Sequence, residues 1–462
     1  MKNTLKLILV LVLVASMALS MVACFGNNKA DELAQGVDAE NHIIHVGNTA
    51  ATSGAFAGVG VPFNYAQEAY LWYFTEHLGG YKDAEGNKYT FEFHHYDDGF
   101  DGVKGKTLTQ KLVEEDKVFA LVGHFGSNTV GATVDYLEEQ GIPMVYGVCG
   151  VSDLYNTEKN IMTVQPIYDT EGQSMVATAF ASVEAGGLAA TKVGVIATTD
   201  EAGKGMLNGI RIEAKKLDKA VLIQEVAADA TDYTAAVTAL QSAGCDVVII
   251  AANQAPFIAI ANTFVGAQYE NVKIVTSYVS ANATAMGGLV LTGAINATRE
   301  VYAGAWLVTG SLPSDTKGWK DYVEYVRIMT LYAQHKGETL ITTEDPTYGA
   351  YLPLMFPTEE WAANGVSAYF LNSYAMAGYV SANVFCEGLA RMNGKALTWD
   401  GFIAAMESAP MNVPMGTSVD YANGNRIGID ALALNKYTVA NFGVGEVYRG
   451  ITDLKTLEDS IK

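Results

Sequence analysis

Short apolar runs alternate with longer helical patterns from His42 onward, and this alternation limits the possible folds more than any other feature of the chain. The first apolar runs have the length of β-strands and occupy residues 43–46, 91–96, 118–122 and 142–146. Helical patterns separate them at residues 62–78, 103–115 and 129–140. Such alternation predicts βαβ units, and therefore a parallel sheet covered by helices.

The alternation restarts after a loop at residues 164–166. The second series has strand-like runs at residues 192–197, 221–226, 246–251 and 272–276. Its helical patterns lie at residues 172–184, 205–217, 232–243 and 257–265. A chain of 462 residues is too long for one small core. We therefore predict the α/β class, with two Rossmann-like lobes that each contain a parallel sheet and are joined by hinge crossovers.

The pattern loosens beyond residue 301. We predict a strand at residues 301–307 and helices at 319–335, 369–392 and 399–407. The end of the chain predicts short strands at 426–434, 437–442 and 446–448, joined by turns at Asn423-Gly424 and Asn435. We interpret the Pro- and Tyr-bearing stretch 338–365 as an insertion. The predicted first lobe comprises residues 41–166 and 302–412 with that insertion, and the second comprises 167–301 and 413–462.

The first 23 residues have the pattern of a secretory signal peptide, with Lys2 and Lys6, an apolar run at residues 7–15 and small residues up to Ala23. The apolar run is short for a membrane span, which needs about 20 residues. The sequence Met21-Val22-Ala23-Cys24 resembles a bacterial lipobox, so we predict lipid attachment at Cys24. Residues 24–40 would then link a lipoprotein to the outer side of the cell membrane. A plain signal peptide with an incidental cysteine, or an N-terminal anchor helix, is the alternative.

The composition is that of a globular and strongly acidic protein. Half of the residues are apolar, 17% are charged, and the net charge is −21. Phosphate backbones repel a chain of this charge, so we predict no nucleic-acid partner. Apart from Cys24 the cysteines are Cys149, Cys245 and Cys386, which lie far apart and form no C-x-x-C motif. We interpret them as small, buried apolar residues.

Motifs for catalysis, cofactors and metals are absent from the sequence. It contains no G-x-S-x-G and no H-E-x-x-H. Gly203-Lys204-Gly205 lacks the upstream Gly and the Ser/Thr of a P-loop, and Gly58-Val59-Gly60 lacks the third Gly of a dinucleotide fingerprint. His94 and His95 lie in a predicted strand, where adjacent side chains point to opposite faces. We therefore predict no enzyme activity, no cofactor and no metal site.

The stretch VGHFGSNTV at residues 122–130 predicts an anion-binding loop. It has the pattern of a strand end, a tight Gly turn and a helix that starts at Ser127-Asn128-Thr129. Free backbone N–H groups and the positive end of the helix dipole meet there, beside hydroxyl and amide donors, which suits an anion. Ser127 as a helix cap only is the simpler alternative. A nucleophilic serine would need a base that the sequence does not offer.

The order of several short motifs resembles the type I extracytoplasmic solute-binding proteins of ABC importers, in particular their leucine/isoleucine/valine-binding group. The matching segments within residues 42–310 are 44–47, 52–54, 96–98, 122–124 with Ser127, 141–144 and 243–248. The remainder of the chain matches loosely, and we recognise no family counterpart for the insertion. The resemblance implies the periplasmic binding protein type I fold, with a ligand cleft between two lobes that close by a hinge motion.

The resemblance also implies the ligand-binding residues. Ser127 falls on the family's anchoring serine, with Asn128 beside it. Val148 and Gly150 fall on the next loop, where the family uses a backbone carbonyl and a threonine. The implied contacts at positions that are aromatic or acidic in branched-chain binders are Val59, Ala202, Asn253 and Tyr278. The family's contacts to the ligand's carboxylate are thus retained, whereas its contacts specific to amino acids are replaced.

The resemblance implies a lipoprotein that captures a small carboxylate-bearing solute, an amino acid or a related compound, for the permease subunits of an ABC transporter. A sensory receptor of the same fold is the main alternative. A surface enzyme is a further alternative, and it would need a catalytic constellation that the sequence does not reveal.

Overall fold

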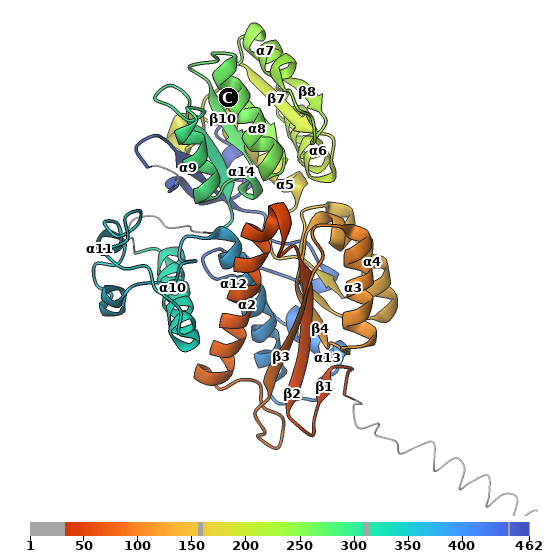
Figure 1. Ribbon diagram of the computed structural model, residues 1–462. Helices are drawn as coiled ribbons and strands as arrows, with labels where there is room; N and C mark the ends of the chain where they lie inside the picture. Colours follow the sequence, from red (N-terminus) through yellow and green to blue (C-terminus); the bar gives the residue numbers. More distant parts are fainter. Residues whose placement is uncertain (1–32, 156–159, 308–314, 442–443, 462) are drawn as a thin grey trace, which may run out of the picture.

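The computed structural model describes residues 33–155, 160–307, 315–441 and 444–461. It has two α/β lobes, each built around its own sheet (Figure 1). The described chain begins at the end of the first lobe that lies far from the second, and it ends on the second lobe (Figure 1). The predicted signal peptide and Cys24 lie outside the described residues.

The sheet of the first lobe follows the first predicted series of strands. Its members are β1 (Val37–Asp38), β2 (Ile43–Ala50), β3 (Thr90–Asp97), β4 (Ala120–Phe125), β5 (Met144–Val148) and β6 (Ile161–Met162). The strands β3, β2, β4, β5 and β6 are neighbours in that order and run parallel. β1 pairs antiparallel with the start of β2. β4 is buried along its whole length, as expected for a parallel strand covered on both faces.

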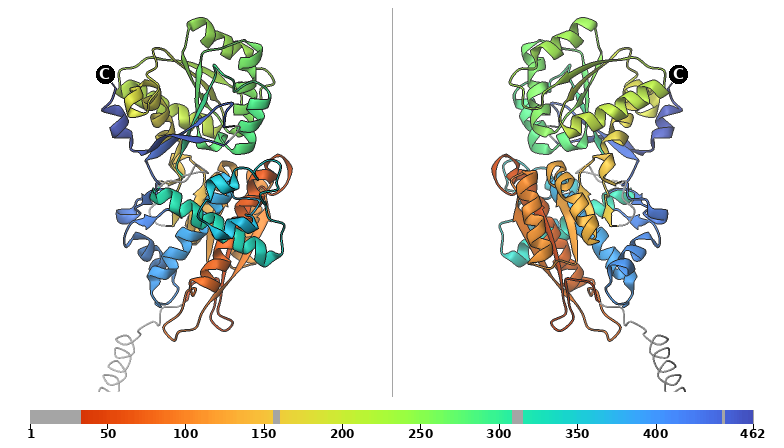
Figure 2. Two further views of the ribbon diagram at one scale, coloured as in Figure 1. Left: turned by 90° about the vertical axis from the view of Figure 1, so that its left-hand side faces the viewer. Right: turned by 90° about the vertical axis from the view of Figure 1, so that its right-hand side faces the viewer.

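Helices cover both faces of the first sheet. They are α2 (Ala57–His77), α3 (Gly102–Glu114), α4 (Ser127–Gln140), α10 (Lys317–Lys336), α12 (Ser373–Met392) and α13 (Trp399–Glu407). α2 and α12 pack on one face, and α3 and α4 on the other (Figures 1 and 2). The predicted insertion lies beside α10 and contains α11 (Leu352–Met355) and η5 (Glu360–Asn364).

The second lobe follows the second predicted series and adds strands from the end of the chain. Its strands are β7 (Val193–Thr198), β8 (Val221–Val226), β9 (Val247–Ala251), β10 (Lys273–Thr276), β11 (Val301–Ala305), β14 (Leu432–Tyr437) and β15 (Glu446–Thr452). The order is β15-β14-β11-β10-β9-β7-β8, and the run from β11 to β8 is parallel. β14 and β15 are antiparallel to their neighbours.

Helices also cover both faces of the second sheet. They are α5 (Tyr168–Phe180), α6 (Glu201–Lys216), α7 (Thr234–Ala243), α8 (Gln254–Gly266), α9 (Ala283–Leu291) and α14 (Leu454–Glu458). α5 and α6 share one core with the sheet, and α7, α8 and α9 share another. The remaining short elements are η1 (Gly54–Phe56), η2 (Ser152–Tyr155), η3 (Val183–Ala185), η4 (Tyr278–Ser280), η6 (Ala422–Gly424), β12 (Met411–Asn412) and β13 (Ser418–Val419). Of the helices in the described part of the chain, none combines the length and hydropathy needed to cross a membrane.

The predicted linker at residues 24–40 differs from the structure in its second half. The backbone N–H of Ala34 donates to the carbonyl of Leu397 at 2.8 Å, and β1 pairs with β2. The Gln35 amide also donates to the carbonyl of Val113 at 2.9 Å. From Leu33 onward the chain is therefore part of the first lobe, because its backbone and side chains are bonded to that lobe.

The crossovers between the lobes also lie elsewhere than the sequence pattern suggests. β11 belongs to the second sheet, since it pairs with β10 and β14, whereas we predict residues 302–412 in the first lobe. Val413 and Tyr421 belong to the core of the first lobe, whereas we predict residues 413–462 in the second. Asn435 is not a turn residue but a buried member of β14 that pairs with Ala303.

The crossovers bring the carboxyl ends of the strands of both sheets to the boundary between the lobes. The segments at residues 163–167 and 426–431 run side by side there, and the Ile429 N–H donates to the carbonyl of Val164 at 3.0 Å. A third crossover follows β11 at Trp306. In open α/β sheets, ligands bind beyond the carboxyl ends of the strands. The fold therefore places a candidate site between the lobes.

Candidate functional site

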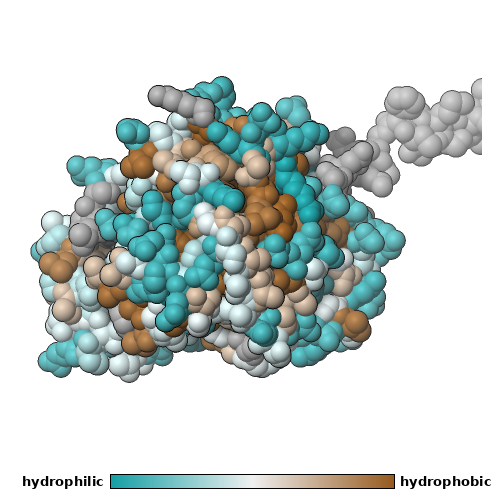
Figure 3. Space-filling view, turned by 90° about the horizontal axis from the view of Figure 1, so that it is seen from above, coloured by the Kyte–Doolittle hydropathy of each residue, from teal (hydrophilic) through white to brown (hydrophobic). Residues whose placement is uncertain are grey.

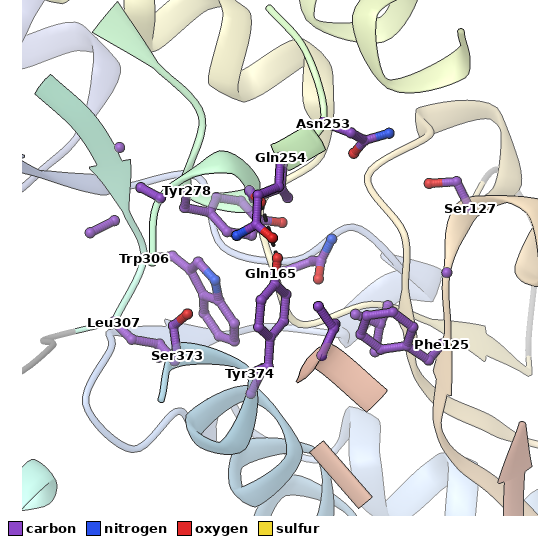
Figure 4. A pocket seen from close by; sticks show the side chains of 18 of the residues that line it. Phe125, Ser127, Gln165, Asn253, Gln254, Tyr278, Trp306, Leu307, Ser373 and Tyr374 are labelled. Atoms are coloured by element: carbon purple, nitrogen blue, oxygen red, sulfur yellow. Dashed lines mark hydrogen bonds between the residues drawn. The ribbon is translucent and has the colours of Figure 1, made fainter. Parts of the chain in front are cut away.

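A cavity with about 1000 Å³ of empty space, including its opening, lies between the lobes. First-lobe elements and the crossovers supply one wall, and second-lobe strand ends supply the other (Figure 4). The residues that line it are Phe56, Val59, Phe100, Phe125, Gly126, Ser127, Tyr146, Val148, Gln165, Tyr168, Asn253, Gln254, Tyr278, Val279, Ala281, Gly304, Ala305, Trp306, Leu307, Ser373, Tyr374, Ala377, Asn435 and Tyr437.

The walls of this cleft are rich in aromatic side chains. Phe56 stacks on Phe100 with 4.5 Å between ring centroids. Trp306 meets the edges of Tyr146 and Tyr278 at centroid distances of 6.0 and 6.2 Å. By contrast, hydrophilic residues predominate on the outer face seen from above, with smaller hydrophobic groups between them (Figure 3). The cleft is therefore the place where an apolar ligand body can be buried.

The polar groups of the cleft are neutral. In the described part of the chain, the lining includes no Asp, Glu, Lys, Arg or His. Its hydrogen-bonding side chains are serine and tyrosine hydroxyls, carboxamides and an indole, namely Ser127, Ser373, Tyr146, Tyr168, Tyr278, Tyr374, Tyr437, Gln165, Gln254, Asn253, Asn435 and Trp306. The walls can therefore donate hydrogen bonds to an anion. Among the described residues, they contain no charged side chain that could form an ion pair with either an anionic or a cationic ligand.

Ser127 stands at the start of α4, directly after β4. Gly126 holds the N-cap position with φ +99°, and among the described residues no side chain caps the helix. A Cβ at Gly126 would lie 2.7 Å from the Phe100 ring, so only glycine fits this turn. The Ser127 hydroxyl lies 3.2 Å from the hydroxyl of Tyr168 and points into the cleft (Figure 4). Ser127 is thus the first residue of α4 and not its cap, and the N–H groups of the first turn have no side-chain cap among the described residues.

The opposite wall carries donors that have no partner. Within the described ranges, the Tyr278 hydroxyl and the Gln254 amide nitrogen are buried and make no hydrogen bond. Tyr278 follows β10 in η4, and Gln254 begins α8 after β9. Burial raises the pKa of Tyr278 well above its ordinary value, so the phenol keeps its proton. Figure 4 shows both side chains on the same side of the cavity. They are ready to donate to an acceptor on a ligand.

A buried acid lies behind this wall. Glu171 on α5 is 1% exposed and accepts a hydrogen bond from the Ser277 hydroxyl. Burial raises the pKa of Glu171 to about 8, although bonds from Ser277 and from the Tyr278 backbone N–H oppose the shift. At neutral pH this carboxyl is therefore mostly protonated.

Among the described residues, two side-chain hydrogen bonds cross from one lobe to the other at the cleft, in addition to the backbone bond from the Tyr168 N–H to the Gly150 carbonyl at 2.7 Å. One joins Ser127 to Tyr168 of α5. In the other, the Tyr374 hydroxyl of α12 donates to the carbonyl of Val279 at 3.1 Å (Figure 4). Burial raises the pKa of Tyr374 to about 12, which keeps this donor protonated. Both contacts would break if the lobes moved apart.

The residues implied by the resemblance are not all at the cleft. Ser127, Val148, Asn253, Tyr278 and Val59 line it. The other three are outside the lining. They are Asn128, whose amide donates to the carbonyl of Phe100 at 3.2 Å, Gly150, on which Tyr168 packs, and Ala202, which is buried at the start of α6.

Sequence reasoning missed most of the aromatic lining. Phe125 and Trp306 lie at or near the ends of predicted strands, since Phe125 comes three residues after the strand predicted at 118–122 and Trp306 lies within the strand predicted at 301–307. Gln165 and Tyr374 carry no local signal, because one lies on a crossover and the other on a long helix remote in sequence. Phe100 lines the cleft from the turn after β3, stacked on Phe56.

Comparisons with known proteins agree with this architecture. The fatty acid ABC transporter substrate-binding protein from Thermomonospora curvata superposes with a TM-score of 0.69 at 16% identity, covering 94% of this chain and 98% of that one. The leucine-binding protein from Thermotoga maritima gives 0.65 at 14% identity, covering 89% and 99%. An R. palustris solute-binding protein solved with benzoate gives 0.62 at 16% identity, covering 89% and 98%. These likenesses confirm the predicted fold.

The sequence matches one curated relative in part and one family over more than half of the chain. An amino acid binding protein of Pseudomonas aeruginosa is 28% identical over 153 residues, which is 33% of this chain and only 40% of that protein's length. The family described as Periplasmic binding protein matches residues 43–316, which is more than half of the chain. The chain therefore belongs to the periplasmic binding protein family, as its motifs predict.

Proposed function

We propose that the cleft captures a small organic acid with an apolar body, and that the protein delivers it to the permease subunits of an ABC transporter. The observation that carries the proposal is an aromatic cavity with two buried, unpartnered donors, the Tyr278 hydroxyl and the Gln254 amide. Aromatic walls suit the body of such a ligand, and donors suit its carboxylate. The names of similar proteins add support, since fatty acids, leucine and benzoate all carry a carboxylate.

Neutral donors and apolar burial supply a gross binding free energy of the size that this site needs. A micromolar complex needs about −8 kcal/mol. Hydrogen bonds to a charged group contribute about 1.5–3 kcal/mol each, and buried apolar area about 25 cal/mol per Å². Two such bonds and about 200 Å² of apolar ligand surface together supply roughly 8–11 kcal/mol before the cost of association. The Ser127 hydroxyl and the first N–H groups of α4 add to this sum.

The proposed ligand has no ammonium group. The described lining offers no carboxylate to pair with one, and the nearby Glu171 is mostly protonated at neutral pH. An α-amino acid would therefore bury its ammonium among neutral partners, which is unfavourable. Acids without an amino group should bind better than their α-amino counterparts.

Delivery requires the lobes to open and close. We assign the Ser127–Tyr168 and Tyr374–Val279 contacts to the closed state, because each joins residues of different lobes. We also propose that lipid on Cys24 holds the protein at the membrane. Metabolic labelling with a fatty acid should then mark the wild type and not Cys24→Ser, and equal labelling of both would refute the anchor.

The proposal is binding and not catalysis. A nucleophilic Ser127 would need a base beside it. Its contact is the Tyr168 hydroxyl, and burial raises the pKa of Tyr168, so that phenol keeps its proton.

A ligand screen tests this function. Benzoate, hydrocinnamate, isocaproate and octanoate are compared with their neutral primary amides by thermal shift, calorimetry and small-angle scattering. A matching acid should stabilise the fold by about 2.7 kcal/mol at a hundredfold excess over Kd and should compact the molecule. Its amide should bind more weakly. Equal binding of acid and amide, or no response to any acid, would refute the proposal.

A further inference from the structure

Two histidines and a glutamate meet on the first lobe, away from the cleft, and we propose that they bind a divalent transition-metal ion of the Zn²⁺ class. His45 lies near the start of β2, and Glu92 and His94 lie on β3. One ligand atom of each residue lies within 4.8 Å of the others. The cleft takes residues from beyond the opposite ends of the strands, so this site is separate from the proposed ligand site.

The pairing of β2 with β3 creates this cluster. The parallel register places His45 opposite Glu92, and Glu92 and His94 share a face because they are two residues apart. His95 points to the other face, where it pairs with Glu68 at 3.4 Å. The sequence predicts no metal site because His94 and His95 diverge. That divergence is observed, but the second histidine comes instead from a neighbouring strand.

The distances fit the edges of a tetrahedron around a metal. His45 Nδ1 lies 3.1 Å from His94 Nε2, Glu92 Oε2 lies 3.5 Å from His45 Nδ1, and the other carboxylate oxygen, Glu92 Oε1, lies 3.7 Å from His94 Nε2. Zinc bonds of 2.0–2.2 Å in a tetrahedron place ligand atoms about 3.3–3.6 Å apart. Because the two short contacts use different oxygens of Glu92, its carboxylate must turn to bring one oxygen within this distance of both nitrogens around an ion.

A carboxylate stands behind one of the imidazoles. The other nitrogen of His94, Nδ1, lies 4.0 Å from Asp116 Oδ1. Asp116 accepts a hydrogen bond from Tyr96 at 2.8 Å, which fixes its position. Metal-binding histidines usually direct their second nitrogen toward a carboxylate, which sets the tautomer and orients the ring. At 4.0 Å the two groups do not form a hydrogen bond, so Asp116 would orient the ring only after His94 moves toward it on metal binding.

The ligand types select the class of metal. Two imidazole nitrogens and one carboxylate suit zinc and its neighbours in the first transition row, whereas Ca²⁺ and Mg²⁺ prefer oxygen ligands. The side chain of Glu92 is 55% exposed, so a fourth position opens to solvent for water or another ligand. A bound ion would tie β2 to β3 and stabilise the first lobe.

Metal titration of the full chain without a histidine tag tests this inference. Zn²⁺ affinity is measured by chelator competition, and Co²⁺ provides an absorption signature of four-coordinate geometry. We expect one ion per chain, a raised Tm with Zn²⁺, and affinity lower by about tenfold or more in His45→Ala, His94→Ala and Glu92→Gln. Asp116→Asn should weaken binding by about tenfold and change the Co²⁺ spectrum.

His95→Ala is the matched control, since it removes an adjacent histidine from the opposite face and should leave metal affinity unchanged. Glu92→Gln should remain folded, because this half-exposed side chain is replaced by one of the same shape. A loss of affinity in this variant therefore reports the loss of a metal ligand. The inference fails if the wild type binds no Zn²⁺ at micromolar concentration. It also fails if His95→Ala loses as much affinity as His94→Ala, or if folded Glu92→Gln binds Zn²⁺ as tightly as the wild type.

Discussion

The two walls of the cleft differ in the partners of three polar groups that line it. On the first-lobe wall, the Ser127 hydroxyl is hydrogen bonded to Tyr168. On the second-lobe wall, the Tyr278 hydroxyl and the Gln254 amide nitrogen have no partner within the described ranges. Burying a donor without a partner costs folding free energy. The difference teaches that the second lobe holds the donors that gain most from a ligand, although the sequence motif points to the first.

The largest expected effect is on stability and concerns the acid behind the second-lobe wall. Because burial raises the pKa of Glu171 to about 8, the folded protein keeps a proton that the unfolded chain releases near its ordinary pKa of 4.5. The stabilisation is fully present below pH 4.5 and is lost as the pH rises toward 8, on the order of 4 kcal/mol. Urea unfolding across this range should show a decline in the wild type that is much reduced in Glu171→Gln.

Glu213, whose pKa is raised to about 7 by burial and by Glu458, contributes to the same decline in both proteins. The difference between the two curves therefore isolates Glu171. Parallel curves would show that Glu171 is already ionised in the folded state.

The next effect concerns the aromatic ring that both walls share. Trp306 is 4% exposed and contacts Tyr146 and Tyr278. Trp306→Ala should weaken binding of the best acid by about 2–4 kcal/mol, roughly 30- to 800-fold in Kd. Trp361→Ala is the control, since Trp361 packs on Phe356 in the insertion and should leave Kd unchanged in calorimetric titration. An unaltered Kd in folded Trp306→Ala would place the ligand elsewhere.

Removing one hydroxyl from the second-lobe wall sharpens the comparison. Tyr278→Phe should weaken acid binding by about 1.5–3 kcal/mol, roughly ten- to a hundredfold, because it removes a bond to a charged group. Stability without ligand should not fall, because the hydroxyl has no hydrogen-bond partner to lose in the part of the chain that the structure describes. Tyr322→Phe is the opposite case, since that hydroxyl donates to the carbonyl of Phe370 at 3.0 Å. It should cost about 1 kcal/mol of stability and leave Kd unchanged.

The smallest effect is expected on the first-lobe wall. Ser127→Ala should weaken binding by about 0.5–1.5 kcal/mol, or roughly two- to tenfold, since Tyr168 and the backbone N–H groups of α4 remain as donors. Calorimetry of Ser127→Ala and Tyr278→Phe with the same acid ranks the walls directly. If Ser127→Ala lost more affinity than Tyr278→Phe, the main contact to the carboxylate would lie on the first lobe and not on the second.

Local patterns in the sequence predict the parts of the fold that are local. The alternation of strands and helices predicts β2 to β5 and β7 to β11, because each βα unit is contiguous in sequence, but it does not predict the two-residue strands β1 and β6. The pattern does not show that β14 returns to pair with β11, because a buried polar residue, Asn435, interrupts its apolar run. Likewise it does not show that residues 33–38 join the first lobe, because short polar segments gain order only from long-range bonds.

The residues of the two candidate sites differ in the same way, since local sequence predicts some of them and long-range packing places the others. Ser127 is predicted because its strand, turn and helix are adjacent in the chain. Gln165 and Tyr374 are missed because they reach the cleft through a crossover and a distant helix. His45 and His94 repeat this lesson, since only the register of β2 against β3 brings them together. Gly150 is predicted as a ligand contact but is instead the surface on which Tyr168 packs.

The central claim, that a neutral aromatic cleft binds an acid through its carboxylate without any partner for an ammonium, has a direct test. Hydrocinnamate and phenylalanine differ only by an α-ammonium group, as do isocaproate and leucine. Calorimetric titration of both pairs should show that at least one acid binds, with its amino acid roughly ten- to a hundredfold weaker or undetectable. Tighter binding of phenylalanine or leucine than of its deaminated partner would contradict the account.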